Sequence, residues 1–390
     1  MNKILPAERL SKIPPYLFAR IDLIKQEEIK KGRKLISLAI GDPDLPTPDF
    51  IIERLISAAR KPENHQYPSY WGMMELRNAV ARWYDRRFGV SLNGGSEVLG
   101  LIGSKEGIAH LPLALVNPGE AVLCPDPGYP VYGAATYMAG GVPLFFPLKK
   151  ENGFLPRFED LDSLVKKGPK ARVLFLNYPN NPTAACASVE FFEEIAQWAK
   201  KNEIVVCHDN AYSEIYFDGK KQPSFLEAPT AREVGVEFHS ISKTYNMTGW
   251  RVGWACGNQD VIAALAQVKT NIDSGAFNAC QEASIEALEN GDSFCEELRK
   301  IYQERRNVLV PALRAIGLQC ENPEATFYVW TELPKGRKSM DFVLELIRDK
   351  GIVATPGNGF GECGEGFVRF TLCSDIETLK RVAQALKTSI

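Results

Sequence analysis

The chain has 390 residues, which is too long for one small core and typical of two domains, or of one large domain with a smaller one attached. Its 46 Lys and Arg residues nearly balance its 48 Asp and Glu residues, and the net charge of −2 argues against a protein that binds nucleic acid or a charged membrane surface. No apolar run approaches the roughly 20 residues of a membrane span, and the start of the chain has no pattern of a secretory signal.

The cysteines and histidines predict neither a disulfide framework nor a metal site. The nine cysteines are scattered and include no C-x-x-C pair, so free thiols in a reducing cytoplasm are the favoured interpretation. The four histidines lie far apart, and none has a cysteine or histidine partner at the spacing of a zinc site. We therefore expect a cytoplasmic protein without a bound metal.

From about residue 97 the chain alternates short apolar runs with helical patterns. The expected strands are Val98–Ile102, Ala121–Cys124, Val142–Phe146, Val173–Leu176, Ile204–His208 and Val236–Ser240. The clearest helical patterns between them follow GSKEG to about residue 116 and cover Phe191–Asn202. This alternation predicts an α/β fold with a mostly parallel, doubly wound sheet flanked by helices.

The last part of the chain has a different pattern. A long helical period runs from Ala283 to Gly317, and a short apolar segment, TFYVW, follows it. The remaining expected elements are a helix near Met340–Lys350, the segment IVAT, the strand FVRFTL and a terminal helix. We expect residues 1–45 and 281–390 to form a smaller α+β domain, and residues 46–280 to form the large domain.

Polar residues follow the ends of the expected strands, which is where doubly wound sheets bind ligands. They are Ser104, Lys105, Tyr129, Asn181, Asp209, Tyr212, Ser240, Ser242, Lys243 and Arg251. As a set they offer an anion cradle, an aromatic ring, an amide, a carboxylate, a phenol, an amine and an arginine. These are the groups needed to hold pyridoxal phosphate.

Several residues of this set, and Arg369 near the end of the chain, also have a structural explanation when each is taken alone. The segment Gly103–Lys105 fits a simple strand-to-helix turn as well as a phosphate site at a helix N-terminus. Tyr129 fits a core tyrosine, and Asp209 fits a helix N-cap as well as a partner for a protonated ring nitrogen. Arg369 lies inside an apolar strand and needs an anionic partner, which is either a ligand carboxylate or a structural ion pair.

Two motifs match known signatures but lack the required context. Residues Gly359–Gly364 match G-x-G-x-x-G, but a strand rather than a helix follows, so we expect a glycine-rich turn. Residues Ser240–Lys243 match the S-x-x-K of acylating serine enzymes, which also need S-D-N and K-T-G. Neither tripeptide occurs in the chain, so an acyltransferase is discounted.

Six segments, in this order, resemble the fold-type-I, class I/II aminotransferases, which use pyridoxal phosphate. They are GSKEG, PDPGYPVY, YPNNPT, HDNAYSE, SISKTYNMTGWRVGW and FVRF. The resemblance extends from about Leu35 to the C-terminus. One residue departs from the family pattern, because Ala184 follows NNPT where the family usually has glycine.

The resemblance implies a role for each matching residue. Lys243 matches the lysine that bonds to the cofactor's aldehyde, and Asp209 matches the carboxylate at the ring nitrogen. Tyr129 matches the aromatic residue that stacks on the ring, and these three residues are the expected catalytic ones. Asn181 and Tyr212 match the pair that binds the ring oxygen. The residues that match phosphate ligands are Ser104, Lys105, Ser240, Ser242 and Arg251.

The resemblance also implies how substrate binds. Tyr67 matches the tyrosine that reaches the phosphate of the neighbouring subunit, which implies a homodimer with shared active sites. Arg369 matches the arginine that clamps the substrate α-carboxylate. The segments PPYLFARI, IGDPDLPTP and KTNIDSGAFNACQ are most similar to the subgroup that acts on LL-diaminopimelate in lysine biosynthesis. The expected substrate contacts are Tyr16, Gly41, Lys105, Asn181, Ser274 and Arg369.

The implied activity is transfer of an amino group from an α-amino acid to 2-oxoglutarate, with Lys243 as general acid and base. Two alternatives keep the same cofactor residues: an aminotransferase of broader specificity for aspartate, alanine or aromatic donors, and a carbon–sulfur lyase on the same scaffold. A transcription regulator would need an additional DNA-binding domain, and the matching segments begin too early in the chain to leave room for one.

Overall fold

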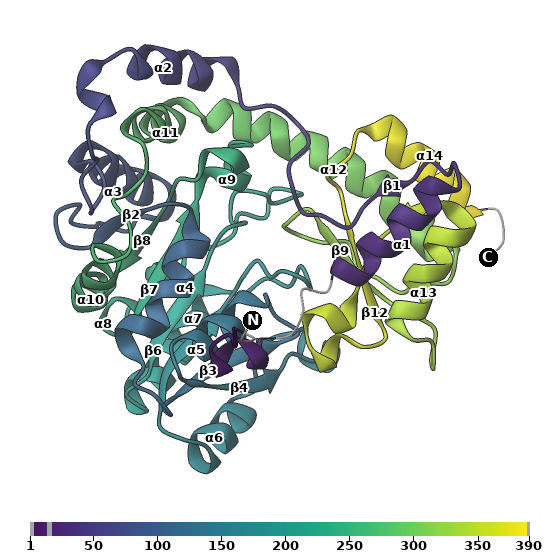
Figure 1. Ribbon diagram of the computed structural model, residues 1–390, viewed down its shortest axis with the longest axis horizontal. Helices are drawn as coiled ribbons and strands as arrows, with labels where there is room; N and C mark the ends of the chain where they lie inside the picture. The colour runs from purple at the N-terminus through teal and green to yellow at the C-terminus, as the bar shows by residue number, and fades with distance from the viewer. Residues whose placement is uncertain (1–3, 14–17, 388–390) are drawn as a thin grey trace.

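The computed structural model describes residues 4–13 and 18–387. A large unit is built around a seven-stranded sheet, and a smaller unit contains two short sheets (Figure 1). The long helix α12 (Asp292–Ala315) extends from the large unit into the smaller one (Figure 1). Within the described ranges, the helices are too short or too polar to span a membrane.

The large sheet has the strand order β2-β8-β7-β6-β5-β3-β4. Its strands are β2 (Val98–Leu101), β3 (Ala121–Asp126), β4 (Val142–Pro147), β5 (Ala171–Leu176), β6 (Val205–Asp209), β7 (Gly235–Ser240) and β8 (Gly253–Gly257). Strands β3 to β7 pair in parallel, whereas β8 is antiparallel to both of its neighbours. The predicted mostly parallel sheet is confirmed. Strand β8 was not predicted, because GWACG is short and glycine-rich and has no alternating pattern.

Two apolar cores lie on opposite faces of this sheet. Leu174 and Phe175 are neighbours in β5 and point to opposite faces, so they belong to different cores. Helices α3 and α7 cover one face, and α4, α5 and α10 cover the other. The helices of the large unit are α2 (Asp49–Ala59), α3 (Met74–Phe88), α4 (Ser104–Leu115), α5 (Val131–Met138), α6 (Phe158–Lys167), α7 (Val189–Lys201), α8 (Ala231–Val234), α9 (Ile241–Thr244), α10 (Gln259–Lys269) and α11 (Asn278–Asn290).

The smaller unit combines segments from both ends of the chain. Strands β1 (Ile36–Ser37) and β10 (Ile352–Val353) pair in parallel. An antiparallel sheet has the order β11-β12-β9. Its strands and the accompanying helical segments are β9 (Tyr328–Glu332), β11 (Thr355–Pro356), β12 (Phe367–Thr371), α1 (Phe18–Lys30), α13 (Ser339–Glu345), the π-helical turn η6 (Leu346–Lys350) and α14 (Ile376–Lys387).

Several expected elements have different bounds in the structure. The helical pattern over residues 283–317 is two helices, α11 and α12, which meet at Gly291. A side chain at Gly291 would collide with the ring of Tyr245, which an ideal Cβ would approach to 2.4 Å. Short 3₁₀ turns also connect the elements: η1 (Glu8–Lys12), η2 (Pro62–His65), η3 (Lys150–Asn152), η4 (Phe225–Glu227), η5 (Thr248–Trp250), η7 (Gly357–Phe360) and η8 (Glu362–Gly364).

The glycine-rich segment near residue 360 forms the turns η7 and η8 and is followed by β12, as predicted. Gly361 has a φ of +134°, and an ideal Cβ there would lie 2.0 Å from Oδ1 of Asp126. The same Oδ1 accepts a hydrogen bond from the Cys363 backbone N–H at 3.0 Å. Glycine is therefore required because this turn closes tightly on the end of β3.

Ala184 has a φ of +60° although it carries a Cβ. The turn thus keeps the conformation that glycine would favour, and the alanine is strained there. We expect Ala184→Gly to raise the free energy of unfolding by about 1 kcal/mol, measured by urea denaturation. Ala185→Gly is the matched control: its φ is not positive, so this change should lower stability instead. Equal effects of the two substitutions would contradict the assignment of strain.

Candidate active site

The polar residues that follow the parallel strands share one edge of the large sheet. Asp209 is the last residue of β6, and Ser240 is the last residue of β7. Lys243 lies in the short helix α9 that directly follows β7, and Ser104 begins α4. Because the carboxyl ends of parallel strands lie at the same edge, these groups surround one place.

Lys243 is half-buried, and its ammonium Nζ donates a hydrogen bond to the Gly41 carbonyl oxygen at 2.9 Å. Burial lowers the pKa of Lys243, and the nearby carboxylate of Asp42 partly opposes this effect. A lowered pKa increases the fraction of free amine, the form that reacts with a carbonyl carbon. Gly41 must be glycine, since an ideal Cβ would lie 2.1 Å from the Tyr328 hydroxyl oxygen.

Asp209 is a buried carboxylate with one oxygen available. Burial raises its pKa to about 6, although a hydrogen bond from Tyr132 opposes the rise. The Tyr132 hydroxyl donates to Oδ2 at 2.8 Å, while Oδ1 is buried and has no hydrogen-bond partner in the described ranges. A buried acceptor without a donor fits a cationic N–H group such as a protonated pyridine nitrogen.

An anion cradle lies at the N-terminus of α4. Gly103 has a φ of +76°, and an ideal Cβ there would lie 2.2 Å from Nη2 of Arg251. Arg251 itself is in the left-handed region, with a φ of +57°. Ser240 and Ser242 join their hydroxyls at 2.8 Å. Helix N-terminal N–H groups, hydroxyls and a guanidinium suit a phosphate, so the cradle fits this part of the cofactor.

Arg369 lies in β12 of the smaller unit and is buried. Its Nη1 donates to Oδ1 of Asn181 at 2.6 Å, and its Nη2 donates to the Ala39 carbonyl oxygen at 2.7 Å. Both acceptors are neutral, and no salt bridge among the described residues involves Arg369. A buried cation without an anion is costly, so this guanidinium fits a ligand carboxylate better than the structural ion pair considered above.

The aromatic residues complete the surroundings of Lys243 and Asp209. The ammonium of Lys105 lies 5.9 Å from the ring centroid of Tyr129, which meets Tyr132 edge-on at 5.8 Å. Tyr212 is buried, and its hydroxyl oxygen lies 3.0 Å from that of Tyr328. The expected aromatic and phenolic groups therefore lie near the expected amine and carboxylate.

Three residues of the site were not predicted from the sequence. Tyr132 donates a hydrogen bond to Asp209, and the hydroxyl of Tyr328 lies within hydrogen-bond distance of the Tyr212 hydroxyl. Asn177 donates from Nδ2 to the Asp209 backbone oxygen at 2.6 Å, and its Oδ1 accepts from the Asn181 N–H at 2.7 Å. The only available signal was position: Asn177 directly follows β5.

The structure does not bring every expected residue to this place. Tyr67 is 91% exposed. Ser274 lies on a loop next to the Tyr67 segment. The closeness of the two segments is shown by Gly275, where an ideal Cβ would lie only 2.9 Å from the Ser69 backbone oxygen. Tyr16 lies outside the described residues.

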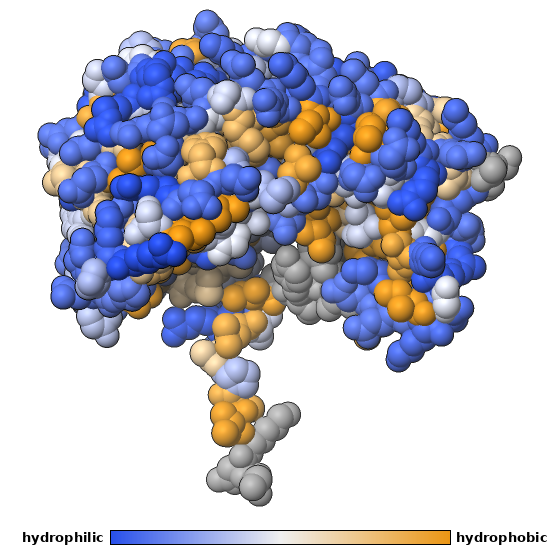
Figure 2. Space-filling model, turned by 90° about the horizontal axis from the view of Figure 1, so that it is seen from above, coloured by the Kyte–Doolittle hydropathy of each residue, from blue (hydrophilic) through white to orange (hydrophobic). Residues whose placement is uncertain are grey.

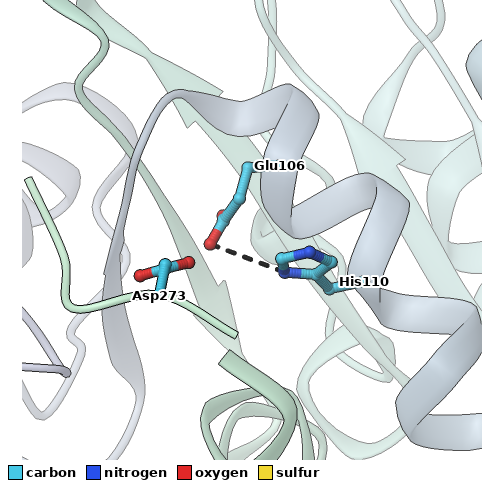
Figure 3. Close-up of side chains that lie close together, drawn as sticks. All are labelled: Glu106, His110 and Asp273. Carbon is cyan, nitrogen blue, oxygen red and sulfur yellow. Dashed lines mark ion pairs between the residues drawn. The ribbon is translucent and has the colours of Figure 1, made fainter. Parts of the chain in front are cut away.

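A partly buried ion cluster lies beside the start of α4. Figure 3 shows Glu106 and His110, one turn apart on α4, together with Asp273. The ammonium of the fully buried Lys269 lies 2.9 Å from Oε1 of Glu106 and 2.6 Å from Oδ1 of Asp273. Because this ammonium already supplies the cation between the two carboxylates, the cluster is better explained as an ion network than as a metal site.

A second ion pair holds the segment that contains Gly41. Arg305 of α12 is buried and binds Asp44 through two hydrogen bonds, of 2.6 and 2.8 Å. We expect Asp44→Asn to lower the free energy of unfolding by about 2 kcal/mol, because Arg305 stays buried without its anion. Urea denaturation measures this change. Asp42→Asn is the control, and an equal loss from both would contradict the assigned role of the pair.

The chain is similar to known proteins over nearly its whole length. The sequence model of the family "Aminotransferase class I and II" matches residues 33–386. The chain is 55% identical to the LL-diaminopimelate aminotransferase of Syntrophobacter fumaroxidans over 98% of both chains. It is 52% identical to the enzyme of that name from Aquifex aeolicus, again over 98% of both. A substrate-bound structure of BacF from Bacillus subtilis superposes with a TM-score of 0.93 at 37% identity, covering 99% of this chain and 98% of the other.

The geometry and the comparisons agree. A lysine with a lowered pKa, a buried carboxylate with a free oxygen and an anion cradle lie at one edge of the large sheet. The family match covers nearly the whole chain. The chain therefore belongs to the class I and II aminotransferases and is a pyridoxal-phosphate-dependent transaminase.

Proposed function

We propose that the enzyme transfers the amino group of LL-diaminopimelate to 2-oxoglutarate, and that the residues around Lys243 form its active site. The main support is the similarity to relatives that carry this name, at 52–55% identity over 98% of both chains. The site supports it through Arg369, a buried guanidinium whose partners are neutral. That group suits the α-carboxylate of an amino-acid substrate.

Pyridoxal phosphate, when bound, supplies an aldehyde carbon and a ring that accepts electrons. Lys243 would hold the aldehyde and later move a proton from the substrate's Cα, for which its lowered pKa is suited. Asp209, through its free oxygen, would keep the ring nitrogen protonated. Tyr129 would lie against the ring, and Asn181 with Tyr212 would bind its oxygen. The proposed phosphate ligands are Ser104, Lys105, Ser240, Ser242 and Arg251.

The proposed substrate contacts are divided between the two units of the fold. Arg369 would hold the α-carboxylate, which fixes the direction of the Cα–H bond relative to Lys243. The Gly41 carbonyl oxygen lies 2.9 Å from the Lys243 ammonium, so Gly41 is a further proposed substrate contact beside the reacting amine. The remaining proposed contacts are Tyr16, Lys105, Asn181 and Ser274.

We also propose a homodimer in which Tyr67 reaches the partner's cofactor. Tyr67 is 91% exposed, and Ile272 and Phe277 are also exposed. Figure 2 shows a segment with hydrophobic residues projecting from the body, and Ile4 and Leu5 are 93% and 78% exposed. Exposed apolar residues mark a protein interface when they form a contiguous patch, and a dimer surface would have to gather these residues into one. The nine cysteines are all free thiols, which supports a cytoplasmic location.

A panel of amino donors with 2-oxoglutarate as acceptor tests the proposed substrate. We expect kcat/KM for LL-diaminopimelate to exceed that for aspartate, alanine and phenylalanine by at least about 100-fold, because a site that binds polar groups rejects analogues that lack them. Strong activity with those donors and none with LL-diaminopimelate would refute it. Release of pyruvate and ammonia from a sulfur amino acid, without glutamate formation, would support a carbon–sulfur lyase instead.

A further inference from the structure

Tyr328 of β9 touches three groups of the active site at once. Its side chain is buried, and its hydroxyl oxygen lies 3.0 Å from the Tyr212 hydroxyl oxygen. The same hydroxyl is so close to the Gly41 Cα that an added Cβ would lie at 2.1 Å. The guanidinium carbon of Arg369 lies 4.2 Å from the centroid of the Tyr328 ring. No other described side chain contacts both Tyr212 and Arg369 in this way.

The hydroxyl of Tyr328 has a defined direction once Tyr212 binds the cofactor. A tyrosine hydroxyl carries one hydrogen, and Tyr212 would donate its hydrogen to the ring oxygen of the cofactor. The Tyr328 hydroxyl must then donate to the oxygen of Tyr212. Hydrogen bonds in such a chain strengthen one another in a buried site, so Tyr328 would make Tyr212 a better donor and would fix its orientation.

The ring of Tyr328 supports Arg369 from one side. Phe360 lies against the same guanidinium, with its centroid 4.7 Å from the guanidinium carbon. Stacking on aromatic rings fixes the plane of a guanidinium, and this plane decides whether two N–H groups can meet one carboxylate. The ring therefore acts on the carboxylate side of the site, while the hydroxyl acts on the cofactor side.

We propose that Tyr328 is a positioning residue with two separable actions: its hydroxyl orients Tyr212 toward the cofactor, and its ring orients Arg369 toward the substrate carboxylate. This inference rests on the proposed function, because it assigns these targets to Tyr212 and Arg369. Tyr328 itself touches neither the cofactor nor the substrate in this account. It links the large unit, which carries Tyr212, to the smaller unit, which carries Arg369.

Tyr328→Phe tests the action of the hydroxyl, because it removes the oxygen and keeps the ring. The readout is the visible absorbance of the bound cofactor, titrated between pH 5 and pH 9. If Tyr212 is a weaker donor, the ring oxygen of the cofactor keeps more negative charge. This charge keeps the Lys243 nitrogen that bonds to the cofactor protonated up to a higher pH. We expect the midpoint of this absorbance titration to rise by about one pH unit, which corresponds in free energy to about one hydrogen bond. The KM for 2-oxoglutarate should stay within about twofold of the wild-type value.

Tyr328→Leu tests the action of the ring, because it removes both the hydroxyl and the stacking surface. We expect the same rise of the midpoint together with a KM for 2-oxoglutarate about fivefold to tenfold higher, as loss of a buried cation–π contact implies. Tyr302→Phe is the matched control: Tyr302 is also buried in the smaller unit, and its ring lies 5.6 Å from that of Phe327. This control should leave both the midpoint and KM unchanged.

The outcomes separate this inference from the proposed function. The inference would be overturned if Tyr328→Phe kept the titration midpoint of the wild type and Tyr328→Leu kept the wild-type KM for 2-oxoglutarate. A rise of the midpoint in Tyr302→Phe equal to that in Tyr328→Phe would also overturn it, because general loosening would then explain the effect. Wild-type protein that takes up no cofactor would instead overturn the proposed function itself.

Discussion

Replacement of Lys243 by alanine should reduce kcat for transamination by at least about 10⁴-fold. The variant loses the amine that holds the aldehyde and the group that moves the Cα proton, and a positioned acid or base alone contributes about 10²–10⁴-fold. The other cofactor contacts remain, so the variant should still take up pyridoxal phosphate, which dialysis followed by an absorbance spectrum measures.

Lys220→Ala is the control for this result. Lys220 is exposed and pairs with Glu324 on the surface, so its removal should leave kcat unchanged. A Lys243→Ala variant that transaminates at the wild-type rate would show that the catalytic amine has been assigned to the wrong residue.

Asp209→Asn should lower kcat by about 10²–10³-fold, the usual loss when one group that stabilises developing charge is removed. Asparagine keeps the shape and can still accept the hydrogen bond from Tyr132, but it cannot keep a ring nitrogen protonated. Tyr132→Phe should have a smaller effect in the same direction, because the carboxylate remains. Steady-state rates of the two variants check this order, and a larger loss in Tyr132→Phe would contradict it.

Asp209→Asn should also stabilise the cofactor-free protein at neutral pH. Burial raises the folded-state pKa of Asp209 to about 6, above the value of about 3.9 in an unfolded chain. Below pH 4 the carboxyl is protonated in both states. As pH rises from 4 to 6, the unfolded chain releases the proton first, so the folded state loses stability, and the full loss is reached above pH 6.

A shift of about two pKa units corresponds to about 3 kcal/mol. Cofactor-free Asp209→Asn should therefore exceed the wild-type free energy of unfolding by about 2–3 kcal/mol at pH 8 and match it near pH 4. Urea denaturation at the two pH values measures the difference. A wild-type protein that is more stable than the variant at pH 8 would contradict the assigned burial of an unpaired charge.

Local patterns in the sequence predicted most of the large sheet and singled out most residues of the proposed site. Strands β3 to β7 each contain a short apolar run, Asp209 ends β6, and Lys243 lies three residues after the end of β7. To predict such positions, only the rule that the carboxyl ends of parallel strands lie at one edge of the sheet is needed. Strand β8 could not be predicted in this way, because its partners β2 and β7, rather than its own residues, decide that GWACG pairs as a strand.

Contacts between the two units were beyond the reach of the sequence. Lys243 and Gly41 are 202 residues apart, and Tyr212 and Tyr328 are 116 apart. Each contact depends on how the smaller unit sits on the large one, which no local period encodes. The role of Tyr328 could therefore be seen only after the fold had brought β9 next to the segment that follows β6.

The most direct test of the account is to find which lysine holds the cofactor. The purified enzyme is reduced with borohydride, digested with a protease, and its peptides are identified by mass spectrometry. We expect the added mass of the reduced cofactor on the peptide that contains Lys243, and on no other. Label on Lys105, on Lys269 or on no peptide at all would contradict the assignment of Lys243 and the site built around it.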